Sequence, residues 1–300
     1  MQVQPTIQIK NLNKLYGKKQ ALCNINLDIK PGMFGLLGKN GAGKTTLMKI
    51  IATLLNKQEG SITVYGISVE KAAEIRKIIG YLPQDFNMYG NMTVYQALDY
   101  LGVLSGMTKS ERKGRISIVL EQVNLEEHAG KKVRMLSGGM KQRLGIAQAL
   151  LHDPKALIVD EPTVGLDPEE RVRFRNLLCQ VAENKTVILS THIVGDVEAT
   201  CEEIGILHEG ELLFHGTVSE LCGLANGSVY TAEVTQKELN WIRSYYIITA
   251  VISQGRKSIV RFLSPDDKPA IGKIVSPNVE DAYILCLNKL SKGGNKYDTI

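Results

Sequence analysis

The sequence predicts an α/β fold over most of the chain, followed by a small α+β appendage. Three observations support this prediction. A short apolar strand at residues 33–37 leads through a glycine-rich loop into a segment with apolar residues at helical spacing. Two later apolar runs, 156–162 and 186–192, have the length of buried strands and end in polar side chains. Residues 85–152 instead have mainly helical periodicity.

Length and composition are those of a globular protein. The 300 residues, 44% of them hydrophobic, can bury a core. Basic and acidic residues number 36 and 31 without any block of like charge, so a nucleic-acid partner is not indicated. The five cysteines are far apart, as is typical of reduced thiols in a cytoplasmic protein. No apolar run approaches the roughly 20 residues of a membrane helix, and the N-terminus lacks signal-peptide features. We therefore expect any membrane connection to come through a partner.

The first residues predict two antiparallel strands. Residues 6–9 and 25–29 both alternate apolar and polar side chains, which favours strands with one exposed face. Tyr16 falls in the predicted connecting loop. Taken alone, it is more simply a loop anchor than a ring that stacks on a nucleotide base.

Residues 38–46 fit the whole phosphate-loop pattern G-x-x-x-x-G-K-[ST] between a strand and a helix. Glycines let the backbone curl so that its N–H groups point at a polyphosphate, and the helix adds the positive end of its dipole. Lys44 can then reach the β- and γ-phosphates, and the Thr45 hydroxyl can ligate Mg²⁺. The segment predicts a nucleotide site.

Two strands and two helices are expected after the loop helix. Residues 60–66 and 78–84 read as strands, and the second ends in Gln84. A glutamine there could bind Mg²⁺ or orient water, or it could be an ordinary loop residue. Capping boxes at Thr93 and Thr108 then open helical patterns. Their apolar stripes are interpreted as core more than docking surface, with a partner contact on some face of this helical part as the alternative.

Three further segments carry polar groups suited to phosphate chemistry. Ser137 and two glycines precede a helical stripe, which makes either an ordinary N-cap or a second anion site. The strand at 156–162 ends in Asp160 and Glu161, placed to hold Mg²⁺ and to polarise water. The next strand ends in His192, in register with Asp160 and Gln84.

The order of these motifs resembles the ATP-binding subunit of ABC transporters. Phosphate loop, Gln84, Leu-Ser-Gly-Gly-Met, Val-Asp-Glu-Pro, Gly-Leu-Asp-Pro and Ser-Thr-His follow one another within residues 6–220. The resemblance implies a P-loop NTPase core with an N-terminal antiparallel β subdomain and an α-helical subdomain at about 85–152. The expected domains are therefore 1–220, which binds ATP, and 221–300, an accessory domain.

The resemblance also implies individual roles. Glu161 would be the general base, His192 the γ-phosphate contact, and Gln84 the group that couples the site to the helical part. The implied Mg²⁺ ligands are Thr45, Gln84 and Asp160. The implied ATP contacts are Tyr16, Gly38, Asn40, Gly41, Ala42, Gly43, Lys44, Thr45, Thr46, Ser137, Gly138, Gly139 and Asp167. Ser137, Gly138 and Gly139, the signature residues, would act with Asp167 across a dimer of two such subunits.

A Mg²⁺-dependent ATPase that powers export through separate transmembrane subunits is thus the leading expectation. Met140 stands where glutamine is commonest, which resembles the branch of multidrug, antibiotic and lipid exporters. The expected assembly is a dimer of two identical copies, peripheral on the cytoplasmic face of the membrane. A soluble ABC-type ATPase on ribosomes or DNA, or an importer subunit, is the alternative.

The C-terminal segment carries no recognisable chemistry. Strands are predicted at 229–234, 247–252 and 258–263, with helices at 237–246 and 279–290. Trp241 and Tyr245 share one helix face and are interpreted as its core. The polar tail from Ser291 predicts a frayed end.

Overall fold

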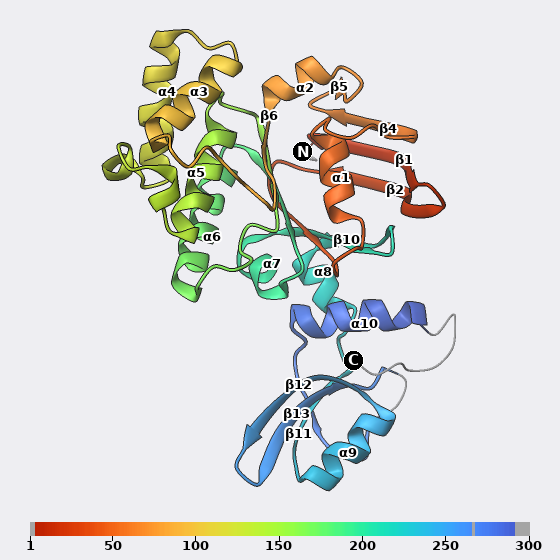
Figure 1. Ribbon diagram of the computed structural model, residues 1–300. Helices are drawn as coiled ribbons and strands as arrows, with labels where there is room; N and C mark the ends of the chain where they lie inside the picture. The colour runs from red at the N-terminus through yellow and green to blue at the C-terminus, as the bar shows by residue number, and fades with distance from the viewer. Residues whose placement is uncertain (1–3, 266–267, 292–300) are drawn as a thin grey trace. The chain divides into compact units, whose positions relative to one another are not determined.

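The computed structural model describes residues 4–265 and 268–291 and divides into two compact units, 1–212 and 213–300 (Figure 1). The division falls inside strand β10, and the domain boundary predicted at 220/221 stays a prediction. Within the described residues, no helix has both the length and the apolar character needed to cross a membrane.

The first unit begins with an antiparallel sheet in the order β2-β1-β4-β5. Its strands are β1 (Ile7–Tyr16), β2 (Lys19–Ile29), β4 (Glu59–Val64) and β5 (Ile67–Ser68). The predicted strand pair is confirmed, but the strands are longer than predicted, and Tyr16 ends β1 instead of lying in a loop. Gly17, at a φ of 59°, allows a two-residue turn that pairs Tyr16 directly with Lys19.

A six-stranded sheet in the order β10-β9-β3-β8-β7-β6 forms the centre of this unit. Strands β9, β3, β8, β7 and β6 run parallel, so that their carboxyl ends lie along one edge. Their bounds are β3 (Gly32–Leu37), β6 (Ile79–Leu82), β7 (Ala156–Asp160), β8 (Thr186–Thr191), β9 (Glu203–His208) and β10 (Glu211–Thr217).

Helices cover the two sheets and form a cluster of their own. Helices α3, α4 and α5 pack on one another, on the side of the unit away from β1, β2 and β4 (Figure 1). Both predicted capping boxes, at Thr93 and Thr108, are present. The helices are α1 (Lys44–Ile51), α2 (Ala72–Ile78), α3 (Val94–Leu104), α4 (Lys109–Gln122), α5 (Gly138–Leu150), α6 (Pro168–Ala182) and α7 (Val194–Thr200).

One apolar core joins the two sheets around α1. Ile9 of β1, Phe34 of β3 and Leu47 of α1 are each at most 2% exposed and belong to the same cluster. Burial of a side chain of this size contributes about 1.5–3 kcal/mol. Because α1 is held by both sheets, the glycine loop that precedes it has a fixed position at the carboxyl edge of β3.

The second unit is an α+β structure, as predicted. Its antiparallel sheet has the order β12-β13-β11-β14. The strands are β11 (Val229–Val234), β12 (Ile247–Gln254), β13 (Lys257–Leu263) and β14 (Lys273–Ile274), and the helices are α8 (Val218–Gly223), α9 (Gln236–Tyr245) and α10 (Val279–Ser291). Apart from Ser291, the tail predicted to fray lies outside the described residues.

The prediction that Trp241 and Tyr245 form the core of α9 is wrong. They do share a face, with ring centroids 5.3 Å apart, but they are 40% and 64% exposed. Leu239 and Ile242 provide the buried face instead, and they pack with Phe262 of β13. Trp241 and Tyr245 lie on a neighbouring face of the helix, outside the buried cluster.

Candidate functional site

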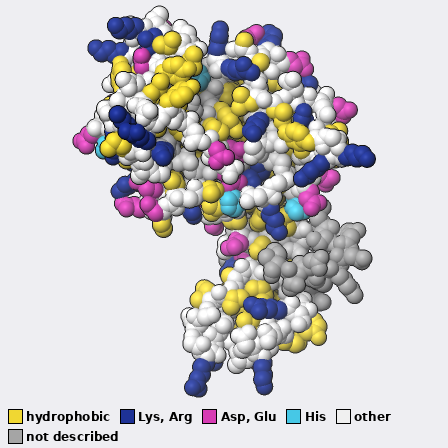
Figure 2. Space-filling view, viewed as in Figure 1, with side chains coloured by type: hydrophobic (Ala, Val, Ile, Leu, Met, Phe, Trp, Pro, Cys, Tyr) yellow, Lys and Arg dark blue, Asp and Glu magenta, His cyan; other side chains and the backbone are white. Residues whose placement is uncertain are grey.

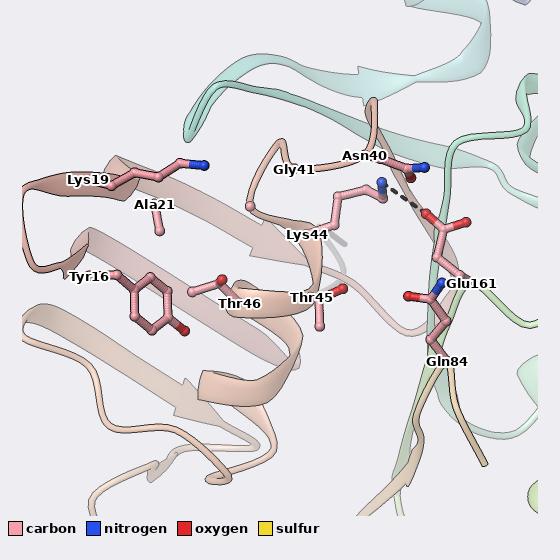
Figure 3. Close-up of a pocket in the computed structure, with 11 residues that line it drawn as sticks. Tyr16, Lys19, Ala21, Asn40, Gly41, Lys44, Thr45, Thr46, Gln84 and Glu161 are labelled. Atoms are coloured by element: carbon pink, nitrogen blue, oxygen red, sulfur yellow. Dashed lines mark ion pairs between the residues drawn. The ribbon is translucent and has the colours of Figure 1, made fainter.

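A pocket of about 330 Å³ lies where the glycine loop meets the ends of β6 and β7 (Figure 3). It gathers residues from five separate stretches of the first unit. They are Tyr16, Lys19, Ala21, Asn40, Gly41, Gly43, Lys44, Thr45, Thr46, Gln84 and Glu161. The structure therefore brings together most of the predicted loop residues with Tyr16, Gln84 and Glu161. Of the other predicted residues, Gly38, Ala42, Asp160 and His192 do not line this pocket. Lys19 and Ala21 of β2 were missed, although the hairpin pairs Lys19 directly with Tyr16.

The glycine loop is shaped by glycines that no other residue could replace without movement. Gly43 has a φ of 109°, and a Cβ there would lie 2.5 Å from the carbonyl oxygen of Ala21. A Cβ on Gly38 would lie 2.3 Å from the carbonyl oxygen of Leu207. Ala42, between these glycines, accepts a hydrogen bond from the backbone of Gly210. The loop is thus pressed against its neighbours in one conformation, as a preformed anion site requires.

Glu161 is the meeting point of the charged groups in the pocket. Its Oε1 lies 3.0 Å from Lys44 Nζ, and the two side chains are 4% and 5% exposed (Figure 3). Its Oε2 lies 2.6 Å from His192 Nδ1, a contact that needs a proton on that nitrogen because a carboxylate only accepts. Lys44 Nζ also donates to the Gly38 carbonyl at 2.7 Å. The predicted base and the predicted phosphate lysine are therefore direct neighbours.

The backbone holds Glu161 in an unusual conformation. Its φ is 49°, in the left-handed region that a residue with a side chain adopts only at a cost of about 1–2 kcal/mol. Its N–H donates to the Ser190 carbonyl at 2.9 Å, which anchors it to the end of β8. This turn aims the carboxylate at Lys44 and His192 instead of along the strand. Such local strain is concentrated at functional sites.

Asp160 is buried beside the pocket with unused hydrogen-bonding capacity. It is fully buried, and neither of its carboxylate oxygens has a hydrogen-bond partner among the described residues. Burial raises the pKa of this carboxyl, an effect that the nearby hydroxyls of Thr45 and Ser190 partly oppose. A divalent cation is the kind of group that such a carboxylate lacks.

The donor set around Asp160 fits Mg²⁺, a cation that prefers oxygen ligands. Thr45 and Gln84 supply a hydroxyl and an amide oxygen at the same pocket. Across the described residues, no three His, Cys, Asp or Glu side chains are arranged to hold a metal. A Mg²⁺ ion here would take its remaining ligands from phosphate and water, as it does in other phosphoryl-transfer sites.

Tyr16 stands at the outer end of the pocket. It is 49% exposed, and Lys14 Nζ lies 5.6 Å from its ring centroid. Lys14 is itself held by a 2.7 Å hydrogen bond from Nζ to the Asn56 carbonyl. A cation on one face of the ring leaves the other face for stacking.

The signature residues and Asp167 do not line this pocket. Ser137 caps α5, its Oγ accepting from the Met140 N–H, and Asp167 caps α6 by accepting from the Glu170 N–H at 2.8 Å. A Cβ on Gly139 would lie 2.2 Å from Glu170 Oε2. The two helix N-termini are therefore adjacent to each other but separate from the residues that line the pocket.

The family model for "ABC transporter" matches residues 22–164. The linearmycin resistance ATP-binding protein LnrL of Bacillus subtilis is 41% identical over 74% of this chain and 72% of its own length. The uncharacterised ABC transporter ATP-binding protein YxlF of the same organism is 37% identical over 87% of each chain. The bacitracin transport ATP-binding protein BcrA of Bacillus licheniformis is 39% identical, over 69% of this chain and 68% of its own.

Solved structures agree with these relatives. The dimeric structure of MJ0796, a bacterial ABC transporter cassette, superposes with a TM-score of 0.64 at 31% identity, covering 70% of this chain and 98% of the cassette. A post-hydrolysis form of MJ0796 bound to ADP and Pi gives a TM-score of 0.63 at 30% identity with the same coverage. Sequence motifs, fold and relatives lead to one conclusion: this chain belongs to the ABC transporter family, among its ATP-binding subunits, and is an ATPase.

Proposed function

We propose that this chain hydrolyses ATP to drive export of a substrate through separate transmembrane subunits. The observation that carries the proposal is the carboxylate of Glu161, buried between Lys44 and His192 at a preformed glycine loop. The names of its relatives support export, since they include linearmycin resistance, bacitracin transport and Nod factor export proteins. An antibiotic, peptide or lipid-like molecule is the substrate class that these names suggest.

ATP binds along the pocket from Tyr16 to Glu161. The adenine stacks on the free face of Tyr16, and the loop N–H groups surround the phosphates. Lys44 and Thr46 contact the phosphate oxygens. Because Lys44 is already paired with Glu161, the incoming γ-phosphate competes with that carboxylate for the ammonium group.

Hydrolysis uses the two residues that follow the strand ends. Glu161 accepts a proton from the attacking water, and His192 orients Glu161 and contacts the γ-phosphate. Gln84 faces the same pocket and orients the water or a metal ligand. Thr45, Gln84 and Asp160 would hold Mg²⁺, which would neutralise the charge that spreads over the phosphate oxygens.

A second subunit completes the site. Ser137, Gly138 and Gly139 lie at a helix N-terminus outside the pocket, so their free N–H groups suit the phosphate of another molecule. Asp167, at the adjacent helix, makes the link across the dimer. The dimeric state of the MJ0796 cassette supports this arrangement. We infer that ATP joins two copies of this chain, most simply as a homodimer.

The transmembrane partner binds at the helical part of the first unit. Figure 2 shows hydrophobic side chains on the surface over α3 and α4. Tyr89, Val103 and Leu104 are 51–66% exposed, with Tyr89 packed edge-on against Tyr100. An exposed apolar patch of this kind is typical of an interaction site. This contact would hold the chain at the cytoplasmic face of the membrane, and the proposal includes no nucleic acid.

The test is purification of the tagged chain from detergent-solubilised membranes of its own cells. We expect one multispanning membrane protein to co-purify and, after reconstitution, to stimulate Mg²⁺-dependent ATPase activity. Inverted vesicles should then accumulate a probe antibiotic, bacitracin or linearmycin, only with ATP. ATPase activity that sediments with ribosomes or DNA would contradict the transport role, and ATP-driven release from the vesicles would contradict export.

A further inference from the structure

Asp196 is a fully buried carboxylate for which the chemistry above has no use. It lies in α7, four residues after His192, and its side chain is 1% exposed. Thr163 Oγ1, itself in a buried residue, donates to Asp196 Oδ2 at 2.5 Å. The other oxygen, Oδ1, lies 3.6 Å from Arg175 Nη1 and makes no hydrogen bond within the described part of the chain. Burying a carboxylate with so few partners costs free energy, so stability alone does not account for it.

The partners of Asp196 come from the segment that follows Glu161 in the chain. Thr163 lies two residues after Glu161 and four before Asp167, in the turn that leads to α6. Arg175, from the middle of α6, also donates to the Gly195 carbonyl at 3.3 Å. Asp196 therefore ties the segment that carries Glu161 and Asp167 to the helix that begins just after His192.

This bond adds to other links between the same two segments. The Glu161 N–H bonds to the Ser190 carbonyl, and the Glu161 carboxylate contacts His192. Those two links fix the strand ends, whereas the Thr163–Asp196 bond fixes the turn beyond them. Among the hydrogen bonds of the described residues, it joins the two segments within this turn, whereas the Arg175–Gly195 bond joins them farther along, from the middle of α6.

We propose that Asp196 is a positioning residue for ATP hydrolysis. Through Thr163 it keeps the turn that ends at Asp167 in register with His192, so that the base and the dimer-facing turn move as one body. The inference rests on the proposed function, because it assumes that Asp167 meets a second subunit. A change at this bond should therefore alter the chemical step and the dimer, and leave ATP binding to one subunit nearly unchanged.

The test compares three single variants of the full chain. Thr163→Val removes the donor without changing shape, and Thr163→Ser restores a hydroxyl. Thr200→Val is the matched control, since the Thr200 hydroxyl bonds to the backbone carbonyl of Asp196 at 2.7 Å and not to its carboxylate. Steady-state kcat and KM for Mg-ATP are measured, with melting temperature as a check on folding.

A displaced catalytic group costs up to about 10²-fold in rate, so we expect kcat of Thr163→Val to fall by about 10- to 100-fold while KM changes less than about threefold. Thr163→Ser should recover most of the parental kcat, and Thr200→Val should match the parent. In a Glu161→Gln background, Thr163→Val should weaken ATP-induced dimerisation measured by light scattering. If Asp196→Ala folds, adding Thr163→Val to it should cause little further loss of kcat, because Asp196→Ala has already removed the bond to Thr163.

Two results would overturn the inference. Parental kcat in Thr163→Val, with only a lower melting temperature, would make the bond purely structural. A rise in KM that accounts for the whole loss of kcat/KM would show that the bond acts on nucleotide binding. If the parent itself neither hydrolyses ATP nor dimerises as Glu161→Gln, the proposed function fails together with this inference, and the two failures are thereby distinguished.

Discussion

Replacing Glu161 by glutamine tests the centre of the proposed chemistry. The change keeps the shape of the side chain but removes the charge that lies 3.0 Å from Lys44, and it leaves one acceptor oxygen where the carboxylate offered one to Lys44 and one to His192. A general base contributes about 10²–10⁴ in rate. At 1.36 kcal/mol per tenfold, the barrier should rise by about 2.7–5.4 kcal/mol.

Although the rate of hydrolysis falls, the affinity for ATP should rise or stay unchanged. In the parent, Glu161 and the γ-phosphate compete for an ammonium group that is only 5% exposed. A charge-assisted hydrogen bond is worth about 1.5–3 kcal/mol, and part of that energy opposes nucleotide binding. Glutamine competes less well, so the Kd for ATP should equal the parental value or fall below it.

The assay is phosphate release at saturating Mg-ATP, together with equilibrium binding of ATP. Glu183→Gln is the matched control, because that carboxylate is exposed at the end of α6, away from the pocket. Hydrolysis by Glu161→Gln at close to the parental rate would refute the assignment of the base. ATP binding weakened tenfold would refute the competition for Lys44.

Three further predictions concern the dimer, the second unit and pH. Ser137→Arg should leave ATP binding to the isolated subunit unchanged yet block ATP-induced dimerisation of the Glu161→Gln protein, measured by light scattering. Ser137→Ala loses the same helix cap without adding bulk and is the control for folding. Equal dimerisation of the arginine variant and its parent would contradict the shared site. Asp281→Asn should destabilise the second unit by about 1.5–3 kcal/mol in urea unfolding, because the carboxylate is fully buried against Arg261; an unchanged midpoint would show that the pair adds nothing. Burial lowers the pKa of His152 below its usual 6.5, so the unfolded state binds more protons and the unfolding free energy should fall as pH drops below about 6.5. The slope of unfolding free energy against pH should be shallower in His152→Gln. Identical slopes in the variant and the parent would exclude this histidine as a cause of the pH dependence.

The sequence predicted best the parts of the site that are local in the chain. The phosphate loop and the polar ends of β6, β7 and β8 each lie within a few residues of a recognisable strand, and parallel strands place such ends along one edge. Lys19 was missed because its contact with the pocket depends on the hairpin register with Tyr16. The bond between Thr163 and Asp196 joins residues 33 apart, and no local sequence pattern predicts it.

The fold was predicted less completely where elements are short. Helices α2 and α7 have seven residues each and no side-chain cap, so neither a start signal nor two full turns of periodicity mark them in the sequence. In α9 the helix was predicted, but its buried face was not. The aromatic pair suggested a core, whereas the smaller Leu239 and Ile242 fill it.

The exposed position of Trp241 has a practical consequence for spectroscopy. It is the only tryptophan in the sequence and lies in the second unit, 5.3 Å from the Tyr245 ring and partly in water. Its emission will therefore respond to the local environment of α9. An unfolding curve followed by this fluorophore would describe the C-terminal unit, and the ATP-binding unit needs a separate optical probe, such as a tryptophan introduced in place of Tyr16.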